Sequence, residues 1–377
     1  MRLIVLSCLL HLFMVWRLVP AWSPWPLAAA ALLLVLAVSA VVLPLGLRGA
    51  RTRSPRWARV LTWTGYLCLG LFSSLLVLTL LREVLLLAAA IVAALVPGGL
   101  DTDTLTALSG RAVPLLALVL TAWGFLNARR TASVVRVDVP IAGLPAALEG
   151  FTIAQISDVH VGPTIGGDYV EAIVHAVNRL GADMVAVTGD LVDGRVQELA
   201  PHVAPLASLR SRHGTYFVTG NHEYYSGAAP WIAELRRLGM RVLLNEHVLL
   251  RHGGAMLLVA GVTDYSAHHF DGAQRSDPQA ALAGASGEAA VKLLLAHQPR
   301  SAEAAVRAGF DLQLSGHTHG GQFWPWNHFV RFQQPFTAGL HRLGALWVYV
   351  SRGTGYWGPP KRFAAPSEIT ALRLVRA

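Results

Sequence analysis

Hydrophobic and polar residues follow two different patterns along this chain of 377 residues. Long apolar stretches fill the first third, and a helix needs about 20 consecutive apolar residues to cross a bilayer. Four stretches come near this length, and they predict an N-terminal helical region with about four transmembrane spans: 3–19, 27–47, 60–81 and 112–126. A further apolar run, 84–96, follows the pair Arg82–Glu83. We interpret it as a tilted or interfacial extension of the third span, with an extra span as the alternative.

The first apolar stretch has one feature of a signal peptide, because Arg2 precedes it. No small-residue cleavage site follows, however, and Trp16, Trp22 and Trp25 are typical of a membrane interface. We therefore expect an uncleaved helix.

Arginine residues predict the orientation, because loops rich in Lys and Arg stay in the cytoplasm. The loop 48–59 contains five arginines, and Arg129 and Arg130 follow the fourth span, whereas the loop 97–110 contains only two charged residues, both aspartates. With four spans, we expect a multi-pass protein of a bacterial inner (cytoplasmic) membrane whose hydrophilic part faces the cytoplasm. An extra span at 84–96 would place that part on the opposite side.

Composition divides the chain in the same way. Hydrophobic residues make up 54% of the sequence and charged residues 14%, against about 25% charged residues in soluble domains. Eleven arginines and three acids in residues 1–130 account for +8 of the formal net charge of +9, so residues 131–377 are nearly neutral. The basic charge thus belongs to the membrane loops, and no nucleic-acid partner is expected. Cys8 and Cys68 lie in apolar stretches, which excludes a disulfide framework and a cysteine-ligated zinc site in the hydrophilic part.

Short β-branched runs begin after Val134. The predicted strands are 151–157, 184–188, 215–219, 256–262, 292–296, 312–315 and 346–351. Helical patterns at 168–180 and 229–238 lie between the early strands. Strands that alternate with helices predict an α/β domain, and the scarcity of helices between later strands indicates that part of the sheet is antiparallel. We expect a transmembrane anchor, 1–130, followed by one α/β domain, 131–377.

Polar side chains follow these strands where each strand ends. They are Asp158 and His160; Asp190 and Asp193; Asn221, His222 and Glu223; His297; and His317 and His319. In α/β sheets, ligands bind beyond the carboxyl ends of the strands, and carboxylates with imidazoles are typical of a metal site. Each motif alone also fits an ordinary turn or helix cap, but the ordered series is much more specific.

The series D-x-H, G-D-x-x-D, G-N-H-E, H and G-H-T-H resembles the calcineurin-like metallophosphoesterase family over about residues 151–377. The runs G-H-T-H-G-G-Q (316–322) and S-R-G-T-G-Y-W-G-P-P-K-R-F (351–363) are similar to its membrane-anchored bacterial subgroup, the phosphoesterases related to YkuE and YaeI. The resemblance implies a four-layer α/β/β/α sandwich. It also implies two divalent metal ions, Mn²⁺, Fe or Zn²⁺, at the strand ends.

Roles for individual residues follow from the resemblance. The implied ligands are Asp158, His160 and His319 for one ion and Asn221, His297 and His317 for the other, with Asp190 bridging the two. His222 would stand beside the centre, either as an acid for the leaving oxygen or as a group that positions the phosphate. Asp193 falls at the position of a supporting acid that does not bind metal.

The expected function is therefore that of a membrane-anchored dimetal phosphoesterase. It would hydrolyse a phosphodiester or pyrophosphate bond of a lipid-linked or nucleotide-type substrate through a metal-bridging hydroxide. Two alternatives are a phosphomonoesterase on soluble substrates and a catalytically inactive metal-binding scaffold. The expected partners are the lipid bilayer and a phosphate ester, and the sequence makes no prediction about the oligomeric state.

An aromatic stretch with interleaved basic residues follows the last metal motif. It includes Phe323, Trp324, Trp326, Phe329, Phe332, Phe336, Tyr356 and Trp357, with Arg331, Arg342, Lys361 and Arg362. One interpretation is core packing around a proline-rich loop. The other is an apolar rim that admits a lipid-linked substrate.

Overall fold

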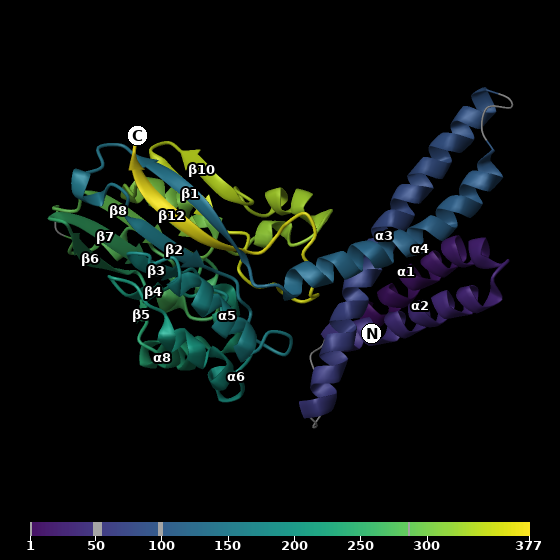
Figure 1. The fold of residues 1–377 in the computed structure, drawn as a ribbon, viewed down its shortest axis with the longest axis horizontal. Coiled ribbons are helices and arrows are strands. Elements are labelled where there is room, and N and C mark those ends of the chain that lie inside the picture. The colour runs from purple at the N-terminus through teal and green to yellow at the C-terminus, as the bar shows by residue number, and fades with distance from the viewer. Residues whose placement is uncertain (1, 48–54, 97–100, 286) are drawn as a thin grey trace. The chain divides into compact units, whose positions relative to one another are not determined.

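The computed structural model describes residues 2–47, 55–96, 101–285 and 287–377. The chain forms two compact units (Figure 1). Residues 1–126 with 358–361 make the helical unit, and residues 127–357 with 362–377 make the α/β unit.

Four long helices make up most of the helical unit: α1 (Arg2–Leu18), α2 (Pro26–Leu47), α3 (Pro55–Leu95) and α4 (Thr102–Arg129). All four are long and apolar enough to cross a membrane, which agrees with the four predicted spans. Buried side chains from each of them, such as Met14, Leu36, Leu75 and Val113, form a common core.

The helices α2 and α3 approach each other closely at two glycines. A Cβ atom on Gly46 would lie 2.6 Å from the Cα atom of Gly65, and a Cβ atom on Gly65 would lie equally close to Gly46. Small residues allow this packing in membranes, where apolar side chains gain nothing by leaving water.

Helix α3 continues without a break through Arg82 and Glu83. Its 41 residues extend over about 60 Å at 1.5 Å per residue, roughly twice the thickness of a hydrocarbon core. The chain does not reverse at the charged pair. Residues 84–95 therefore extend the third helix, as we interpreted them, and do not form a separate antiparallel span.

The fourth helix begins earlier than expected. The prediction of a loop over residues 97–110 is wrong from Thr102 onward, because α4 begins at that residue. The Oδ1 atom of Asp101 accepts hydrogen bonds from the backbone N–H groups of Asp103 (3.1 Å) and Thr104 (3.0 Å). These are the bonds of a helix N-cap, and the D-T-D-T sequence was the local signal for it.

Arg82 and Glu83 connect three helices of this unit. Arg82 is 4% exposed, and its guanidinium donates to Oε1 of Glu83 (2.7 Å) and to Oγ of Ser109 in α4 (2.9 Å). Arg17 of α1 donates to Oε2 of Glu83 at 2.5 Å. The pair that interrupts the apolar pattern therefore holds α1, α3 and α4 together.

The short segment Gly358–Lys361 also belongs to the helical unit. Lys361 is 2% exposed, and its Nζ atom donates to the carbonyl oxygen of Gly70 (2.9 Å), to Oγ of Ser74 (2.5 Å) and to Oγ1 of Thr121 (3.2 Å). These acceptors lie on α3 and α4, so one ammonium group joins the two helices.

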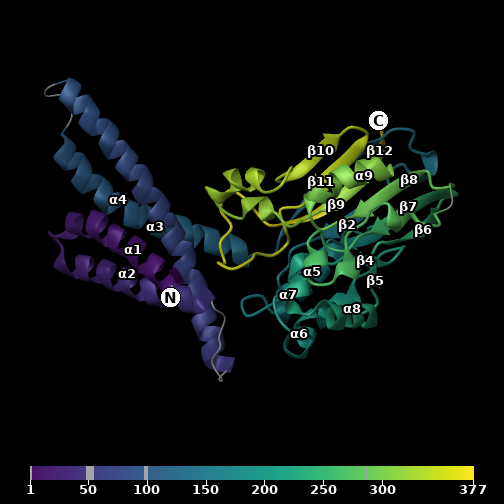
Figure 2. The ribbon, with the colours of Figure 1, turned by 180° about the vertical axis from the view of Figure 1, so that it is seen from behind.

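Twelve strands of the described chain form two six-stranded sheets in the α/β unit. The first sheet has the order β1 (Ser133–Ile141), β12 (Glu368–Arg376), β2 (Thr152–Ile156), β3 (Met184–Val187), β4 (Thr215–Phe217) and β5 (Arg241–Val242). The second has the order β10 (Gly339–Leu343), β11 (Leu346–Val350), β9 (Leu312–Ser315), β8 (Val291–Leu295), β7 (Ala255–Gly261) and β6 (Glu246–His252). Figure 2 shows the second sheet from behind.

Both sheets are mixed, as the scarcity of late helices predicted. The pairs β12–β2, β10–β11 and β6–β7 are antiparallel, and the other neighbours are parallel. The seven predicted strands are β2, β3, β4, β7, β8, β9 and β11, each within two residues at either end. The sequence patterns missed β1, β5, β6, β10 and β12.

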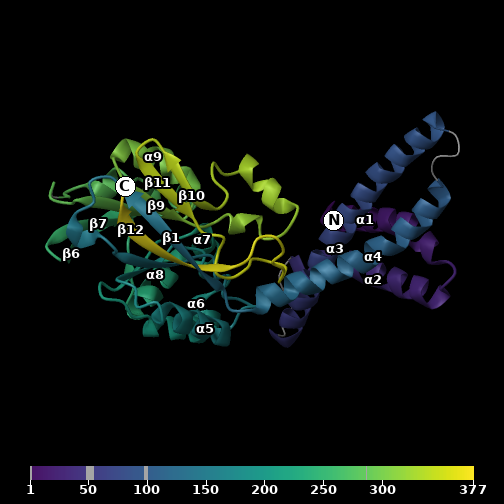
Figure 3. The same cartoon turned by 45° about the horizontal axis from the view of Figure 1, so that its top comes forward.

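Three separate cores show that the unit has four layers. Alternate residues of β3 face opposite sides: Met184 lies in the core between the sheets, and Val185 lies in the core beneath the helices. The helices on that outer face are α5 (Gly167–Asn178), α6 (Val196–Val203) and α8 (Ala228–Arg237). On the opposite face, α9 (Ala302–Ala308) packs over the second sheet (Figure 3). The predicted α/β/β/α sandwich is confirmed.

Candidate metal centre

The ends of five elements place the candidate residues side by side. Asp158 and His160 follow β2, Asp190 and Asp193 follow β3, Asn221 and His222 begin α7 (Asn221–Ser226), His297 follows β8, and His317 and His319 follow β9. Within the described part of the chain, three groups have ligand atoms within 4.8 Å of one another: Asp158, His160 and His319; Asp190, His297 and His317; and His160, Asp193 and His222. The first group contains the three residues expected for one ion, and the second contains Asp190 with the two histidines expected for the other ion.

Asp190 lies between the two predicted sites. Its Oδ2 atom is 3.1 Å from Nε2 of His297, a residue of the second site, and 3.9 Å from Nε2 of His160, a residue of the first. Burial would raise the pKa of Asp190, but the neighbouring His297 holds this pKa well below its usual range. A buried, ionised carboxylate at this position fits a group shared by two cations.

The Asn221 side chain leaves an acceptor unused. Its Oδ1 atom is buried and has no hydrogen-bond partner, which is costly for a polar atom away from water. Asn221 is adjacent to His222, whose backbone N–H donates to Oδ1 of Asp190 at 2.9 Å. An amide oxygen beside Asp190 is a suitable ligand for a hard divalent cation, and the donor set therefore fits two metal ions.

Asp193 supports two of the histidines. Its Oδ1 atom accepts hydrogen bonds from Nδ1 of His160 (3.1 Å) and from Nδ1 of His222 (2.6 Å). This arrangement leaves Nε2 of each ring directed toward the centre, as carboxylates do behind metal-binding histidines. Burial alone would lower the pKa of His222, but the hydrogen bond to Asp193 and the charge of Asp190 outweigh it and raise the pKa to about 9.

A directed chain of hydrogen bonds ends at Asp193. The guanidinium of Arg362 donates to Nδ1 of His319 at 3.0 Å, and because arginine has no acceptor, the neutral His319 ring carries its proton on Nε2. That atom lies 3.0 Å from Nε2 of His160, which can accept the proton because its own Nδ1–H is donated to Asp193. Metal binding at Nε2 of His319 would require the other neutral tautomer, with the proton on Nδ1, and Arg362 would then keep its hydrogen bonds to the carbonyl oxygens of His319 and Arg352.

The remaining two histidines face each other across the second site. His297 donates from Nδ1 to the carbonyl oxygen of Thr188 at 2.7 Å, and its Nε2 atom lies 3.2 Å from Nδ1 of His317. Burial and the nearby His297 lower the pKa of His317 to about 3, so its ring is neutral and has a free lone pair. Burial by itself would lower the pKa of His297, but the charge of Asp190 outweighs this effect and raises the pKa of His297 well above the ordinary value.

Five of the candidate residues have a left-handed backbone. The φ angles are 54° at Asp158, 55° at His160, 51° at Asp190, 70° at His317 and 52° at His319. Such angles are uncommon outside glycine and typically occur where function requires a particular side-chain direction. The chain therefore turns sharply at each strand end, and this turn directs the side chains inward.

Two motif glycines are required by close contacts. A Cβ atom on Gly220 would lie 2.2 Å from Oδ1 of Asp190, and one on Gly316 would lie 2.2 Å from Oδ2 of Asp158. These glycines let the loops after β4 and β9 approach the two carboxylates.

Glu223 supports the site, although its motif in the sequence predicts no role for it. Its buried carboxylate accepts hydrogen bonds from the backbone N–H groups of Gly220 (2.6 Å), Leu191 (2.7 Å) and Asp190 (3.0 Å). Burial and the charge of Asp190 raise its pKa to about 7, against the effect of the three donors. The spacing of Gly220 and Glu223 is that of a helix capping box, which was a usable signal.

The aromatic and basic stretch does not behave as one surface. Lys361 and Arg362 are buried, so they are not part of an exposed basic rim, whereas Trp326, Phe332 and Trp357 are exposed. The two buried basic residues therefore fit the core-packing interpretation. The three exposed rings fit the interpretation as an apolar surface.

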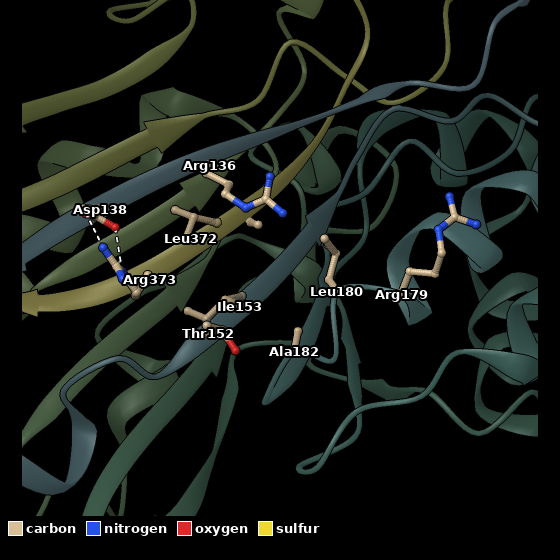
Figure 4. Close-up of a pocket in the computed structure, with 10 residues that line it drawn as sticks. Arg136, Asp138, Thr152, Ile153, Arg179, Leu180, Ala182, Leu372 and Arg373 are labelled. Carbon is tan, nitrogen blue, oxygen red and sulfur yellow. Dashed lines mark hydrogen bonds and ion pairs between the residues drawn. The ribbon is translucent and has the colours of Figure 1, made fainter.

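A surface depression of about 460 Å³ lies at the opposite end of the first sheet (Figure 4). It is lined by the start of β2, which ends at the candidate centre, and by Arg136 and Arg179. Its one acidic lining residue, Asp138, is paired with Arg373 at 2.7 Å. This depression has no ligand group of the kind found at the strand ends.

A two-sheet sandwich with carboxylates and histidines at its strand ends defines the class of metallophosphoesterases. The family model for the calcineurin-like phosphoesterases matches residues 151–321. An uncharacterized metallophosphoesterase of Aquifex aeolicus is 34% identical over 233 residues, which cover 61% of this chain and 87% of that protein. The chain belongs to the calcineurin-like metallophosphoesterase family.

Two further relatives extend the comparison. A bovine "transmembrane protein with metallophosphoesterase domain" is 41% identical over 292 residues, covering 74% of this chain and 65% of that protein. The uncharacterized metallophosphoesterase YkuE of Bacillus subtilis is 28% identical over 239 residues, covering 61% of this chain and 81% of that protein. The chain thus spans slightly less than two thirds of the bovine relative. The bovine name and the four apolar helices together indicate a membrane protein.

Proposed function

We propose that this chain is a metal-dependent phosphoesterase that hydrolyses a phosphodiester or pyrophosphate bond. The observation that carries the proposal is the position of Asp190, which joins two ligand groups that lie beside His222. Asp158, His160 and His319 would hold one ion, and Asn221, His297 and His317 would hold the other, with Asp190 shared. When bound, two divalent ions would activate a water molecule for attack on phosphorus and neutralise the phosphate oxygens.

The chain's own residues would orient the substrate and move a proton. Asp193 holds the His222 ring through Nδ1, so Nε2 of His222 is the atom that faces the reaction. A raised pKa keeps this nitrogen protonated near neutral pH. His222 therefore donates the Nε2 proton to the leaving oxygen, and the resulting neutral ring takes up a proton again from water. Glu223 and Gly220 keep the loops of Asp190 and Asn221 in place.

A lipid-linked or nucleotide-type substrate fits the rest of the chain best. Four apolar helices of membrane-spanning length precede the catalytic unit, and exposed aromatic rings lie beyond the last metal motif. Together they support a substrate with an apolar part over a small soluble phosphate ester.

For the domain organisation, we propose a membrane anchor at residues 1–130 and a catalytic domain at 131–377. The two compact units support this division, except that Gly358–Lys361 belongs to the helical unit. We also propose a bacterial inner membrane with the catalytic domain in the cytoplasm. Arg56 and Arg59 at the start of α3 favour that side, as do Arg129 at the end of α4 and Arg130 directly after it. Arg48, Arg51 and Arg53 lie outside the described residues. Labelling of an introduced Ser367→Cys from each face of sealed vesicles after mild unfolding reports the side directly.

Hydrolysis of bis(p-nitrophenyl) phosphate by the full chain in detergent tests the activity. The reaction is measured with Mn²⁺ and with chelator, beside p-nitrophenyl phosphate as the monoester. We expect Mn²⁺-dependent cleavage of the diester that is lost in Asp190→Asn and retained in the control Asp138→Asn, an exposed acid at the opposite end of the sheet. Turnover that survives chelation or Asp190→Asn contradicts the proposed metal chemistry. Faster cleavage of the monoester favours the soluble phosphomonoesterase, and metal binding without any turnover favours the inactive scaffold.

A further inference from the structure

Gln322 clamps the backbone of Trp357. The Oε1 atom of Gln322 accepts the backbone N–H of Trp357 at 2.8 Å, and its Nε2 atom donates to the carbonyl oxygen of Trp357 at 2.8 Å. Gln322 is buried, whereas the Trp357 side chain is 51% exposed. A fixed backbone under an exposed indole means that the ring is held at the surface by two hydrogen bonds.

The indole is held beside His222. The ring centroids of Trp357 and His222 are 5.8 Å apart with an interplanar angle of 72°, and those of Tyr225 and His222 are 5.2 Å apart at 71°. The ring centroids of Phe270 and Tyr225 are 5.5 Å apart. We call Tyr225, Phe270 and Trp357 the aromatic rim, and all three side chains are more than half exposed.

Exposed rings at this place contrast with the polar groups beneath them. The neighbouring ligand residues Asp158, Asp190 and His297 are almost completely buried, so the rim is the part of this site that water reaches most easily. Contiguous exposed aromatic side chains commonly mark a contact surface. Because Trp357 and Tyr225 pack against the imidazole of His222, they lie near the place where a group would receive the His222 proton.

We propose that the aromatic rim is a subsite for an apolar group, aryl or alkyl, on the leaving side of the scissile phosphate. The inference rests on the proposed function, since it takes His222 as the donor to the leaving oxygen. The aromatic rim would determine which substrates bind, a property that the metal-ligand motifs alone do not specify. Gln322, the last residue of G-H-T-H-G-G-Q, positions the rim by clamping Trp357.

Binding of phosphonates tests the subsite without turnover. The probes are methyl-, phenyl- and hexylphosphonate, titrated by calorimetry into the Mn²⁺-loaded full chain in detergent. We expect phenylphosphonate, hexylphosphonate or both to bind about tenfold or more tightly than methylphosphonate, as ring contacts of this kind usually contribute. A preference for phenyl alone indicates a flat group such as a nucleobase, and a preference that includes hexyl indicates a lipid chain.

Trp357→Ala is expected to abolish the preference while methylphosphonate affinity and Mn²⁺ content stay unchanged. Trp357→Phe, which keeps a ring, is expected to retain most of it, and Phe332→Ala, an exposed ring outside the rim, is the control. Equal binding of the three probes by the unaltered chain overturns the subsite, as does an equal loss for all three in Trp357→Ala. If either of these results is found while the unaltered chain still cleaves the diester, the proposed function stands without the subsite. If neither cleavage nor phosphonate binding occurs, the proposed function has failed.

Discussion

The backbone N–H of Asp190 donates a hydrogen bond to the side-chain carboxylate of Glu223 at 3.0 Å. Asp190 reaches its left-handed conformation at the end of β3, and Glu223 is the third residue of α7. The carboxylate therefore connects the loop that carries the shared acid to the helix that begins with Asn221. The same carboxylate accepts hydrogen bonds from the backbone N–H groups of Gly220 and Leu191, so all three of these hydrogen bonds come from backbone donors.

Replacing Glu223 by Gln should lower both stability and metal binding. An amide has one acceptor oxygen, and its NH₂ group would face backbone N–H donors, which leaves buried donors unpaired at roughly 1–3 kcal/mol. We expect the melting temperature of the full chain in detergent to fall by about 2–12 °C, with less bound Mn²⁺ per chain. Glu303→Gln, an exposed glutamate in α9, is the matched control. Unchanged melting and metal content in Glu223→Gln would contradict this role.

Replacing Asp193 by Asn should change the pH dependence of the reaction. Asp193 is the main group that raises the pKa of His222, so its neutralisation lets that pKa fall toward the ordinary 6.5. His222 donates only when protonated, and the alkaline limb of the pH–rate profile should therefore move to lower pH by about 1–2 units.

The profiles for Asp193→Asn are compared at saturating Mn²⁺, because bound cations lower the pKa of His222 in both proteins. Asp138→Asn should give the profile of the unaltered chain. Coincident alkaline limbs for Asp193→Asn and the unaltered chain would show that His222 does not act as the acid.

Replacing Arg362 by Met should empty one ion site more than the other. Arg362 donates to Nδ1 of His319 and to the carbonyl oxygens of His319 and Arg352. Without these hydrogen bonds, neither the backbone of His319 nor the direction of its ring is held. We expect about one Mn²⁺ per chain in place of two, measured by elemental analysis after gel filtration.

Arg362→Lys provides the second test, since it keeps the charge but lacks the planar fork of donors. It should bind more metal than Arg362→Met and less than the unaltered chain. Arg342→Met, at an exposed arginine that stacks on Trp347, should bind two ions. Two ions in Arg362→Met would remove the link between Arg362 and the first site.

Replacing Glu83 by Gln should loosen the helical unit. The carboxylate pairs with both Arg17 and Arg82, and removal of one partner leaves buried positive charge uncompensated at about 3–5 kcal/mol. We expect earlier thermal unfolding and faster proteolysis between the helices in detergent, with Asp103→Asn, an exposed acid at the start of α4, as the control. In Arg17→Gln/Glu83→Gln the loss should be smaller than the sum of the single losses. Strict additivity would contradict the direct pairing.

Residues that follow one another in the chain were the most predictable part of this molecule. Seven strands could be read from β-branched runs, and the polar residues directly after them are the ones that meet at the centre. The strand β12 could not be predicted in its place, because it enters between β1 and β2 and pairs Ser133 with Glu368. No local pattern reports a partner more than two hundred residues away.

The sequence by itself determined the four apolar helices, the α/β class and the carboxylates and histidines of the candidate metal centre. Length, periodicity and residue chemistry are local properties, and each acts over a few neighbouring positions. Only the tertiary structure decided which groups support those donors: Arg362 behind His319, Asp193 behind His160 and His222, and Gln322 beneath Trp357. Each of these bonds joins segments between 29 and 43 residues apart. Such partners come together only when two sheets stack and their strand ends converge, because the energy of each contact depends on a neighbour that the local chain does not contain.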